Sequence, residues 1–133
     1  MAAFRIRLLP ENRALELRLS RGNWYELEDG SRLPVATRPA WCAQCGAFVE
    51  AEFLPPTDPP ADPPVSQRRQ QWLERRSSPP HCLECGSSNI TLLPILQEMP
   101  SPCHEGTLTV EPGLITPPIL HNRLYTPEGA RKA

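Results

Sequence analysis

Apolar and polar side chains alternate along the N-terminal third of the chain, which is the pattern of half-buried β-strands. Residues 4–9 alternate apolar side chains with arginines, and residues 14–19 alternate leucines with charged side chains. Two such segments around a polar link predict an antiparallel hairpin. A second hairpin is predicted from residues 24–27 and 32–37, because the Asp29-Gly30 turn between them favours a tight reversal.

Prolines punctuate the rest of the chain and keep its predicted elements short. Proline pairs recur through residues 55–64, which is typical of polyproline II or of a linker. Residues 66–78 favour a short helix, with a serine cap at the first position and two prolines beyond the end. Short strands are predicted at residues 107–110 and 122–125, and residues 126–133 are expected to form a frayed tail.

The composition limits the size of the core. Apolar residues make up 39% of the 133 residues, and 18 residues are prolines. A core this small usually needs a cross-link, such as a bound metal, or a partner to be stable. The net charge of −1 gives the molecule no overall basic field for nucleic acid or acidic membranes. We find no signal peptide and no apolar run of membrane-spanning length, and therefore expect a cytoplasmic protein. In that compartment paired cysteines are more often metal ligands than disulfides.

Two turns of the form C-x-x-C-G carry the clearest chemistry in the chain. Their cysteines are Cys42, Cys45, Cys82 and Cys85. Two thiolates at this spacing can point at one ion, and the glycine after each second cysteine can adopt the positive φ that such a turn needs. Together the turns supply the four sulfurs of a structural zinc site. We therefore predict one zinc ion with no open coordination position for catalysis.

These turns resemble those of the zinc-ribbon and rubredoxin-like superfamily, over roughly residues 40–95. The resemblance implies that each turn belongs to a β-hairpin and that a third strand completes a small sheet. Residues 46–81 separate the turns, which is longer than the usual spacing of about 15–20 residues. Doubling a loop costs only about 0.6 kcal/mol, whereas structural zinc contributes on the order of 10 kcal/mol. The longer connection is therefore compatible with the site.

Two other states of these cysteines remain open. Iron in the same four-thiolate site would make the protein a rubredoxin-like electron carrier. Such carriers usually surround the iron with aromatic side chains near both turns, whereas Trp41 and Phe48 flank only the first turn here. The second alternative is a set of cysteines without metal, either free or in disulfides. The odd number of cysteines, five, counts against a disulfide framework.

The predicted helix would bring one aromatic and four basic side chains to one broad face. These residues are Arg68, Arg69, Trp72, Arg75 and Arg76. Three hypotheses fit these residues. In the first, the arginines contact nucleic-acid phosphates and an exposed Trp72 stacks on a base; in the second, this face contacts a protein. In the third, Trp72 packs on the body of the protein as an anchor and the arginines around it are solvated. We prefer the third, and the acidic segment 50–62 is a candidate to face the basic helix.

Cys103, His104 and Glu105 are consecutive, and neighbours in an extended chain point to opposite faces. We therefore expect a lone cysteine beside a surface histidine rather than a catalytic triad. Two alternatives stay open. The CHEG segment could be the remnant of a third cysteine turn, and His81 could replace a ligand, although four cysteines already fill the site.

The sequence therefore predicts a mainly β protein of small antiparallel sheets with a zinc ribbon, one short helix in a proline-rich insertion and an extended C-terminal tail. The expected parts are a β-hairpin or meander (residues 1–39), the ribbon (40–95) with its insertion (55–80), and a C-terminal extension (96–133). We expect a non-enzymatic adaptor that binds a macromolecular partner, with protein favoured over nucleic acid. We infer no small-molecule substrate and no membrane association.

Overall fold

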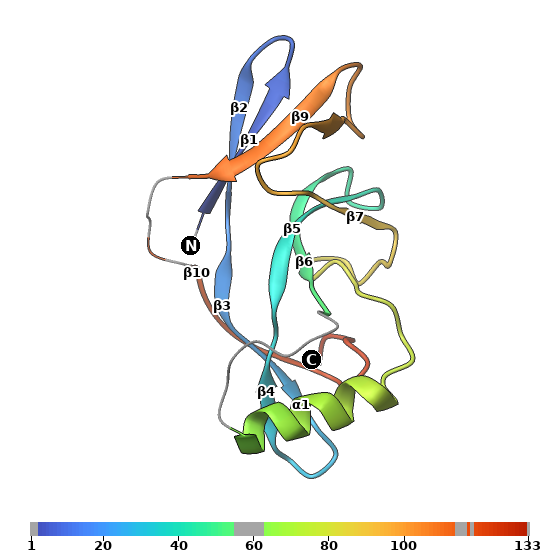
Figure 1. Ribbon diagram of the computed structural model, residues 1–133. Coiled ribbons are helices and arrows are strands. Elements are labelled where there is room, and N and C mark those ends of the chain that lie inside the picture. Colours follow the sequence, from blue (N-terminus) through green and yellow to red (C-terminus); the bar gives the residue numbers. More distant parts are fainter. Residues whose placement is uncertain (1–2, 55–62, 114–116, 118, 133) are drawn as a thin grey trace.

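The computed structural model describes residues 3–54, 63–113, 117 and 119–132. In this part of the chain ten strands form three small sheets, and one helix lies beside them (Figure 1). The elements are β1 (Ala3–Leu9), β2 (Arg13–Arg18), β3 (Ser20–Glu26), β4 (Arg32–Pro34), β5 (Thr37–Cys42), β6 (Ala47–Glu52), α1 (Pro63–Arg75), β7 (Ile90–Leu92), β8 (Met99–Pro100), β9 (Thr107–Pro112) and β10 (Ile119–Tyr125). The mainly β class predicted from the sequence is confirmed.

The first sheet has the order β2-β1-β9-β8 and brings together segments from both halves of the chain. The predicted N-terminal hairpin is confirmed, because β1 and β2 pair antiparallel with Ile6 opposite Leu15. On its other side β1 pairs with β9, where Ile6 faces Val110. The sequence predicted β9 as a short strand but gave no indication of its place beside the N-terminal hairpin.

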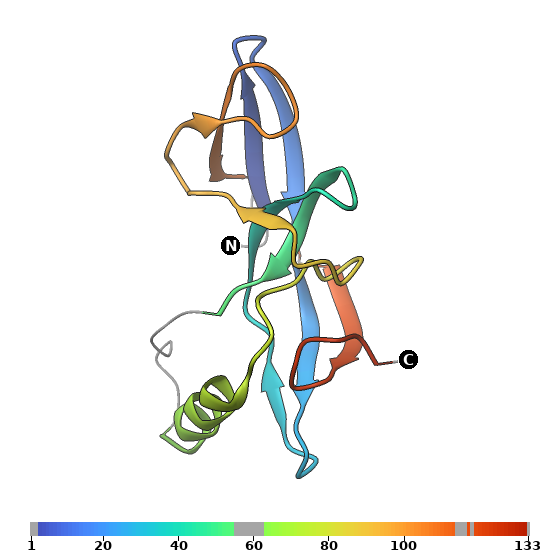
Figure 2. The same ribbon diagram turned by 90° about the vertical axis from the view of Figure 1, so that its right-hand side faces the viewer.

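The second sheet has the order β10-β3-β4 and contains the second predicted hairpin, in which Tyr25 lies opposite Leu33. Because β2 runs almost directly into β3, one extended ribbon passes from the first sheet to the second (Figure 2). β10 pairs with β3 in parallel, so the sheets are not all antiparallel as predicted. Gly22 permits this pairing, since a Cβ there would lie 1.9 Å from the carbonyl oxygen of His121.

The third sheet has the order β6-β5-β7, and α1 lies at the end of the molecule formed by β3 and β4 (Figure 1). The helix begins at Pro63, earlier than predicted, because proline is tolerated in the first turn. It ends at Arg75 rather than at residue 78. The predicted proline-rich linker covered residues 55–64: its last proline pair, Pro63 and Pro64, belongs instead to α1, and residues 55–62 lie outside the described residues. Among the described residues no helix has the length and apolarity that a membrane span requires.

Within the described part of the chain, buried apolar side chains form three clusters of five rather than one large core, as the low apolar content implies. The cluster of the first sheet contains Ile6, Leu8, Leu93, Leu108 and Val110. The cluster between α1 and the second sheet contains Tyr25, Leu33, Trp72, Leu83 and Tyr125. The cluster of the third sheet contains Ala40, Cys42, Val49, Ala51 and Cys82. Two predicted metal ligands are therefore also core residues of the third sheet.

The last residues of the chain fold back on themselves, so the expected frayed tail is wrong for residues 126–132. The N–H of Thr126 donates to the carbonyl oxygen of Ala130 (2.7 Å), and the N–H of Lys132 donates to that of Leu124 (2.9 Å). Pro127 and Glu128 of this turn also bond to α1 and to the serines that follow it. The sequence showed only a short polar segment with a glycine, and nothing local in it indicates a helix elsewhere as its partner.

Candidate metal centre

The first cysteine turn connects β5 to β6. Cys42 is the last residue of β5, and its neighbours across the sheet are Ala47 of β6 and Ile90 of β7. The turn closes through a hydrogen bond from the N–H of Gly46 to the carbonyl oxygen of Cys42 (2.9 Å), with Gly46 at φ +63°. The N–H of Cys45 points at the Sγ atom of Cys42 (3.4 Å). The hairpin that the resemblance implies for this turn is present, and its backbone places an N–H group against a sulfur.

The second cysteine turn repeats this geometry without a second regular hairpin. The N–H of Gly86 donates to the carbonyl oxygen of Cys82 (2.9 Å), and Gly86 has φ +77°. Before the turn, Cys82 makes a single antiparallel bridge to Ala51 of β6. After it, the chain forms β7, which pairs with β5. Both turns are therefore fixed to the same three-stranded sheet. The first joins β5 to β6, and the second lies between the bridge to β6 and strand β7.

The four sulfur atoms converge on one point. All four lie within 4.8 Å of one another. The Sγ atoms of Cys42 and Cys85 are 3.5 Å apart, and those of Cys45 and Cys82 are 3.9 Å apart. Sulfurs at the corners of a tetrahedron, about 2.3 Å from a central ion, are separated by about 3.8 Å. The cysteines are free thiols rather than disulfides, and together they can hold one metal ion.

The thiols differ in how readily they ionise. Burial opposes the thiolate of Cys42, but the N–H of Cys45 and the surrounding thiols outweigh it and lower the pKa of Cys42 to about 7. The hydrogen bond with Cys85, followed by burial, raises the pKa of Cys45 well above its usual value. Burial likewise raises the pKa of Cys82. Ionisation is therefore favoured at Cys42 and opposed at Cys45 and Cys82, and a cation at the centre would stabilise their thiolates.

The other sulfur and imidazole candidates lie outside this cluster. His81 precedes Cys82, but its Nε2 atom lies 3.2 Å from the carbonyl oxygen of Glu128. Cys103 is exposed in the loop between β8 and β9, with its Sγ atom 3.8 Å from Nδ1 of His104. The imidazole is instead held by Ser101, whose Oγ atom is 2.5 Å from Nδ1. His81, Cys103 and His104 therefore do not join the four-cysteine set.

A buried ion pair ties α1 to the third sheet: the expected contact of the acidic segment 50–62 with the basic helix is present at Glu52 and Arg76, although the sequence did not indicate that this pair is buried. Arg76 Nη1 lies 2.7 Å from Glu52 Oε2, and Nη2 lies 2.8 Å from Oε1. The two side chains are 1% and 0% exposed. The hydroxyl of Tyr25 donates to Glu52, and burial followed by the charge of Glu52 raises the pKa of Tyr25. The N–H of His81 also donates to Glu52 (3.0 Å), immediately before the second cysteine turn.

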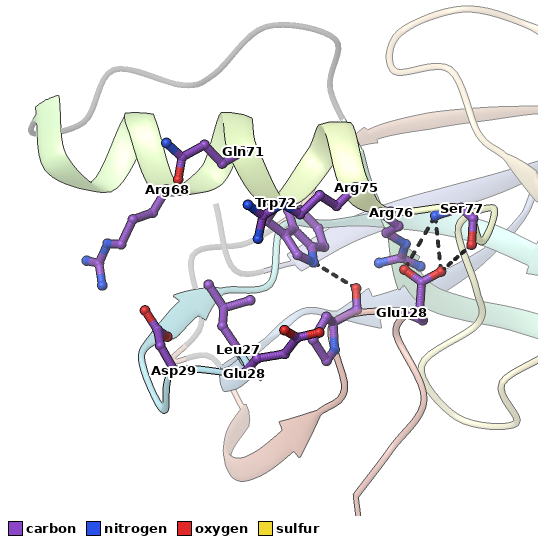
Figure 3. Close-up of a pocket in the computed structure, with 11 residues that line it drawn as sticks. Leu27, Glu28, Asp29, Arg68, Gln71, Trp72, Arg75, Arg76, Ser77 and Glu128 are labelled. Carbon is purple, nitrogen blue, oxygen red and sulfur yellow. Dashed lines mark hydrogen bonds between the residues drawn. The ribbon is translucent and has the colours of Figure 1, made fainter.

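The five helix residues singled out in the sequence separate into buried and outward groups. Trp72 is 5% exposed, packs against Tyr25 at 4.5 Å between ring centroids, and donates its indole N–H to Pro127 (2.7 Å; Figure 3). It is therefore the buried anchor that we expected. Arg69 and Arg76 are also buried, so the expected rim of solvated arginines is wrong for these two. Arg68 is half-buried and Arg75 is exposed.

Glu128 is a further contact that the sequence did not indicate. Its carboxylate accepts hydrogen bonds from the N–H and hydroxyl groups of Ser77 and Ser78, at the end of α1. These bonds, those from Ser77 first, lower the pKa of Glu128 to about 2. The C-terminal turn is thus held to the helix, which explains why it does not fray.

No family model, curated protein or solved structure matches this chain. The arrangement of the four cysteines and the residues around them therefore carries the functional argument.

Proposed function

We propose that the protein is a non-enzymatic zinc-ribbon module in which one structural zinc ion, bound by Cys42, Cys45, Cys82 and Cys85, holds the third sheet together. The observation that carries this proposal is the convergence of four thiols within 4.8 Å of one another. Four sulfur ligands complete a tetrahedral zinc site and leave no position for water or substrate. The small clusters of the core supply the reason for a metal, because the third cluster consists largely of small side chains and two of the ligands.

Zinc is favoured over iron by the surroundings of the sulfurs. Trp41 and Phe48 pack edge to face beside the first turn, with ring centroids 5.0 Å apart. No aromatic residue flanks the second turn in the sequence, where serines and Asn89 follow Cys85 and Gly86. Elemental analysis of protein purified without added metal is expected to find about one zinc per chain and no visible iron absorbance. Iron bound stoichiometrically would replace the proposal by the electron-carrier alternative.

We further propose that the module binds a protein partner rather than nucleic acid. Two of the four helix arginines, Arg69 and Arg76, are buried and so unavailable to a phosphate backbone. Only Arg68 and Arg75 remain for such a contact, and each phosphate contact contributes a separate salt-dependent increment to affinity. Two increments are too few for strong binding at physiological salt.

Fluorescence anisotropy with single-stranded and duplex oligonucleotides tests this choice. We expect no binding at physiological salt and only weak binding at low salt. Sub-micromolar binding that is lost in the Arg68→Gln/Arg75→Gln variant, with its melting temperature unchanged, would instead support the nucleic-acid alternative.

A further inference from the structure

A pocket of about 620 Å³ lies between α1, the turn that joins β3 to β4, and the C-terminal turn (Figure 3). Its volume is in the range of about 300–1,000 Å³ that is usual for sites that bind compact ligands. The pocket is separate from the cysteine cluster, since none of the four cysteines lines it. It is instead lined by the helix face that carries Arg68, Trp72 and Arg75, for which the sequence allowed several roles.

The floor of the pocket is apolar and fixed in position. Leu27 and Trp72 form it: Trp72 belongs to the cluster between α1 and the second sheet, and Leu27 packs against that cluster. The indole N–H of Trp72 is already bonded to Pro127, so the ring offers only its apolar surface to a ligand. An apolar group placed here would therefore contact carbon without displacing a hydrogen bond.

The walls carry opposite charges in equal number. Three arginines and three carboxylates line the pocket: Arg68, Arg75, Arg76, Glu28, Asp29 and Glu128. Arg76 and Glu128 are committed to internal partners, Glu52 and the two serines after the helix. Of the remaining four, the arginines come from α1 and the acids come from the β3–β4 turn.

These remaining charges are available to a ligand. Within the described part of the chain, Glu28, Arg68 and Arg75 make no hydrogen bond or ion pair, and Asp29 bonds only its neighbour Ser31. The hydrogen bonds from Ser31, with a smaller contribution from Arg68, hold the pKa of Asp29 below its usual range. Figure 3 shows Arg68 extending from the helix towards the turn that carries Asp29. The arginines of one wall thus face the carboxylates of the other wall without forming an ion pair with them.

This distribution of charge excludes ligands of a single sign. A polyanion such as a nucleic-acid strand would meet the carboxylates of Glu28 and Asp29 as soon as it reached Arg68 and Arg75. A polycation that reached Glu28 and Asp29 would likewise meet the positive charges of Arg68 and Arg75. Like charges brought together across an interface oppose binding, whereas complementary ones set specificity and register.

We propose that this pocket binds a short peptide segment of a partner protein, in which an apolar side chain on Leu27 and Trp72 is flanked by an acidic residue facing Arg68 and Arg75 and a basic residue facing Glu28 and Asp29. The proposal deepens the function proposed above and rests on it, because it takes the partner to be a protein. It assigns the contact to the pocket and states the chemistry of the segment that is recognised.

A defined peptide array tests this assignment on the full-length, zinc-loaded chain. The peptides are capped hexapeptides with a central Leu-Phe pair, flanked on the two sides by every combination of Glu, Lys and Gln. Binding is followed by the NMR shift of the Trp72 indole N–H. We expect peptides with opposite flanking charges, in one of the two orders, to bind about tenfold more tightly than peptides with like charges.

A charge-reversal variant supplies the sharper comparison. In Arg68→Glu/Arg75→Glu both walls become acidic, so the preference should move from oppositely charged to doubly basic peptides. The matched control is Arg13→Glu/Arg21→Glu, which changes the net charge equally at two exposed arginines that do not line the pocket. This control should keep the wild-type preference.

Three results would overturn the assignment: no peptide of the array binding up to about 1 mM, equal binding by all charge combinations, or displacement of bound peptide by an oligonucleotide. Metal content and fold are measured on the same sample first. A folded sample without zinc refutes the proposed structural metal whatever the peptides do. A zinc-loaded sample that binds no peptide refutes only the pocket.

Discussion

Arg76 and Glu52 form a bidentate ion pair, with N–O distances of 2.7 and 2.8 Å, that joins the end of the insertion helix to the end of β6. Glu52 also accepts the N–H of His81, the residue before Cys82. The helix, the third sheet and the second cysteine turn therefore meet at one carboxylate. Their stabilities should be coupled, because a change at this carboxylate alters contacts of all three.

Arg76→Gln is expected to lower the free energy of unfolding by about 3–5 kcal/mol, because it leaves the buried carboxylate of Glu52 without its charge partner. Urea unfolding of the zinc-loaded protein measures this loss. The matched control is Arg75→Gln, an exposed arginine one position away, which should change stability by no more than about 0.5 kcal/mol. Equal effects of the two substitutions would contradict the burial of the pair.

Trp72→Ala should cost about 3–5 kcal/mol, since it removes a large aromatic side chain from the cluster that holds α1 to the second sheet. Trp72→Phe keeps a ring beside Tyr25 but loses the indole N–H that reaches Pro127, and should cost about 1–3 kcal/mol. Thermal unfolding ranks the two variants. A Trp72→Ala protein with the wild-type melting temperature would mean that the helix does not depend on this anchor.

The hydrogen bonds to Glu128 predict a dependence of stability on pH. The folded-state pKa is lowered to about 2, from an ordinary value of 4.5. The stabilisation is therefore complete above pH 4.5 and is lost as the pH falls towards 2. We expect the stability difference between wild type and Glu128→Gln, measured by urea unfolding, to stay constant from neutral pH down to about pH 5.5 and to shrink below pH 4.5. A difference that grows on acidification would contradict the assignment.

Cysteine substitutions separate the four proposed metal ligands from the fifth cysteine. Cys82→Ser removes one sulfur of the cluster and a core residue of the third sheet, so the protein should lose zinc and become unfolded or insoluble in that region. Cys103→Ser lies outside the cluster and should keep both metal content and melting temperature. Loss of zinc in the Cys103→Ser protein would require this residue to join the site.

The sequence predicted those parts of the structure that depend on local pattern. The alternation in residues 4–9 and 14–19 predicted β1 and β2, and the paired glycine-terminated turns predicted the four-cysteine set. Trp72 was expected to be an anchor because a short helix with so few apolar residues needs one. Each of these inferences uses either residues that are close together in the chain or, for the cysteines, a spacing that is typical of metal ligands.

Long-range choices of partner could not be predicted in this way. Arg76 looks like its three neighbouring arginines, and only the tertiary position of Glu52 makes it a buried ion pair. Residues 122–125 of β10 were predicted as a strand, but nothing local in the sequence indicates its parallel pairing with β3 or the register shift between Leu120 and Arg123. The C-terminal turn is fixed by Ser77 and Ser78, which are far away in sequence.

Removal of the metal tests the central claim most directly. The measurement is the amide NMR spectrum of the zinc-loaded protein before chelation, after chelation and after zinc is returned. If the proposed structural zinc supplies the folding free energy of the third sheet, resonances from β5, β6, β7 and both cysteine turns should collapse when zinc is removed and recover when it is restored. An unchanged spectrum in protein shown to be free of metal would contradict the account, since the four thiols would then hold no structural ion.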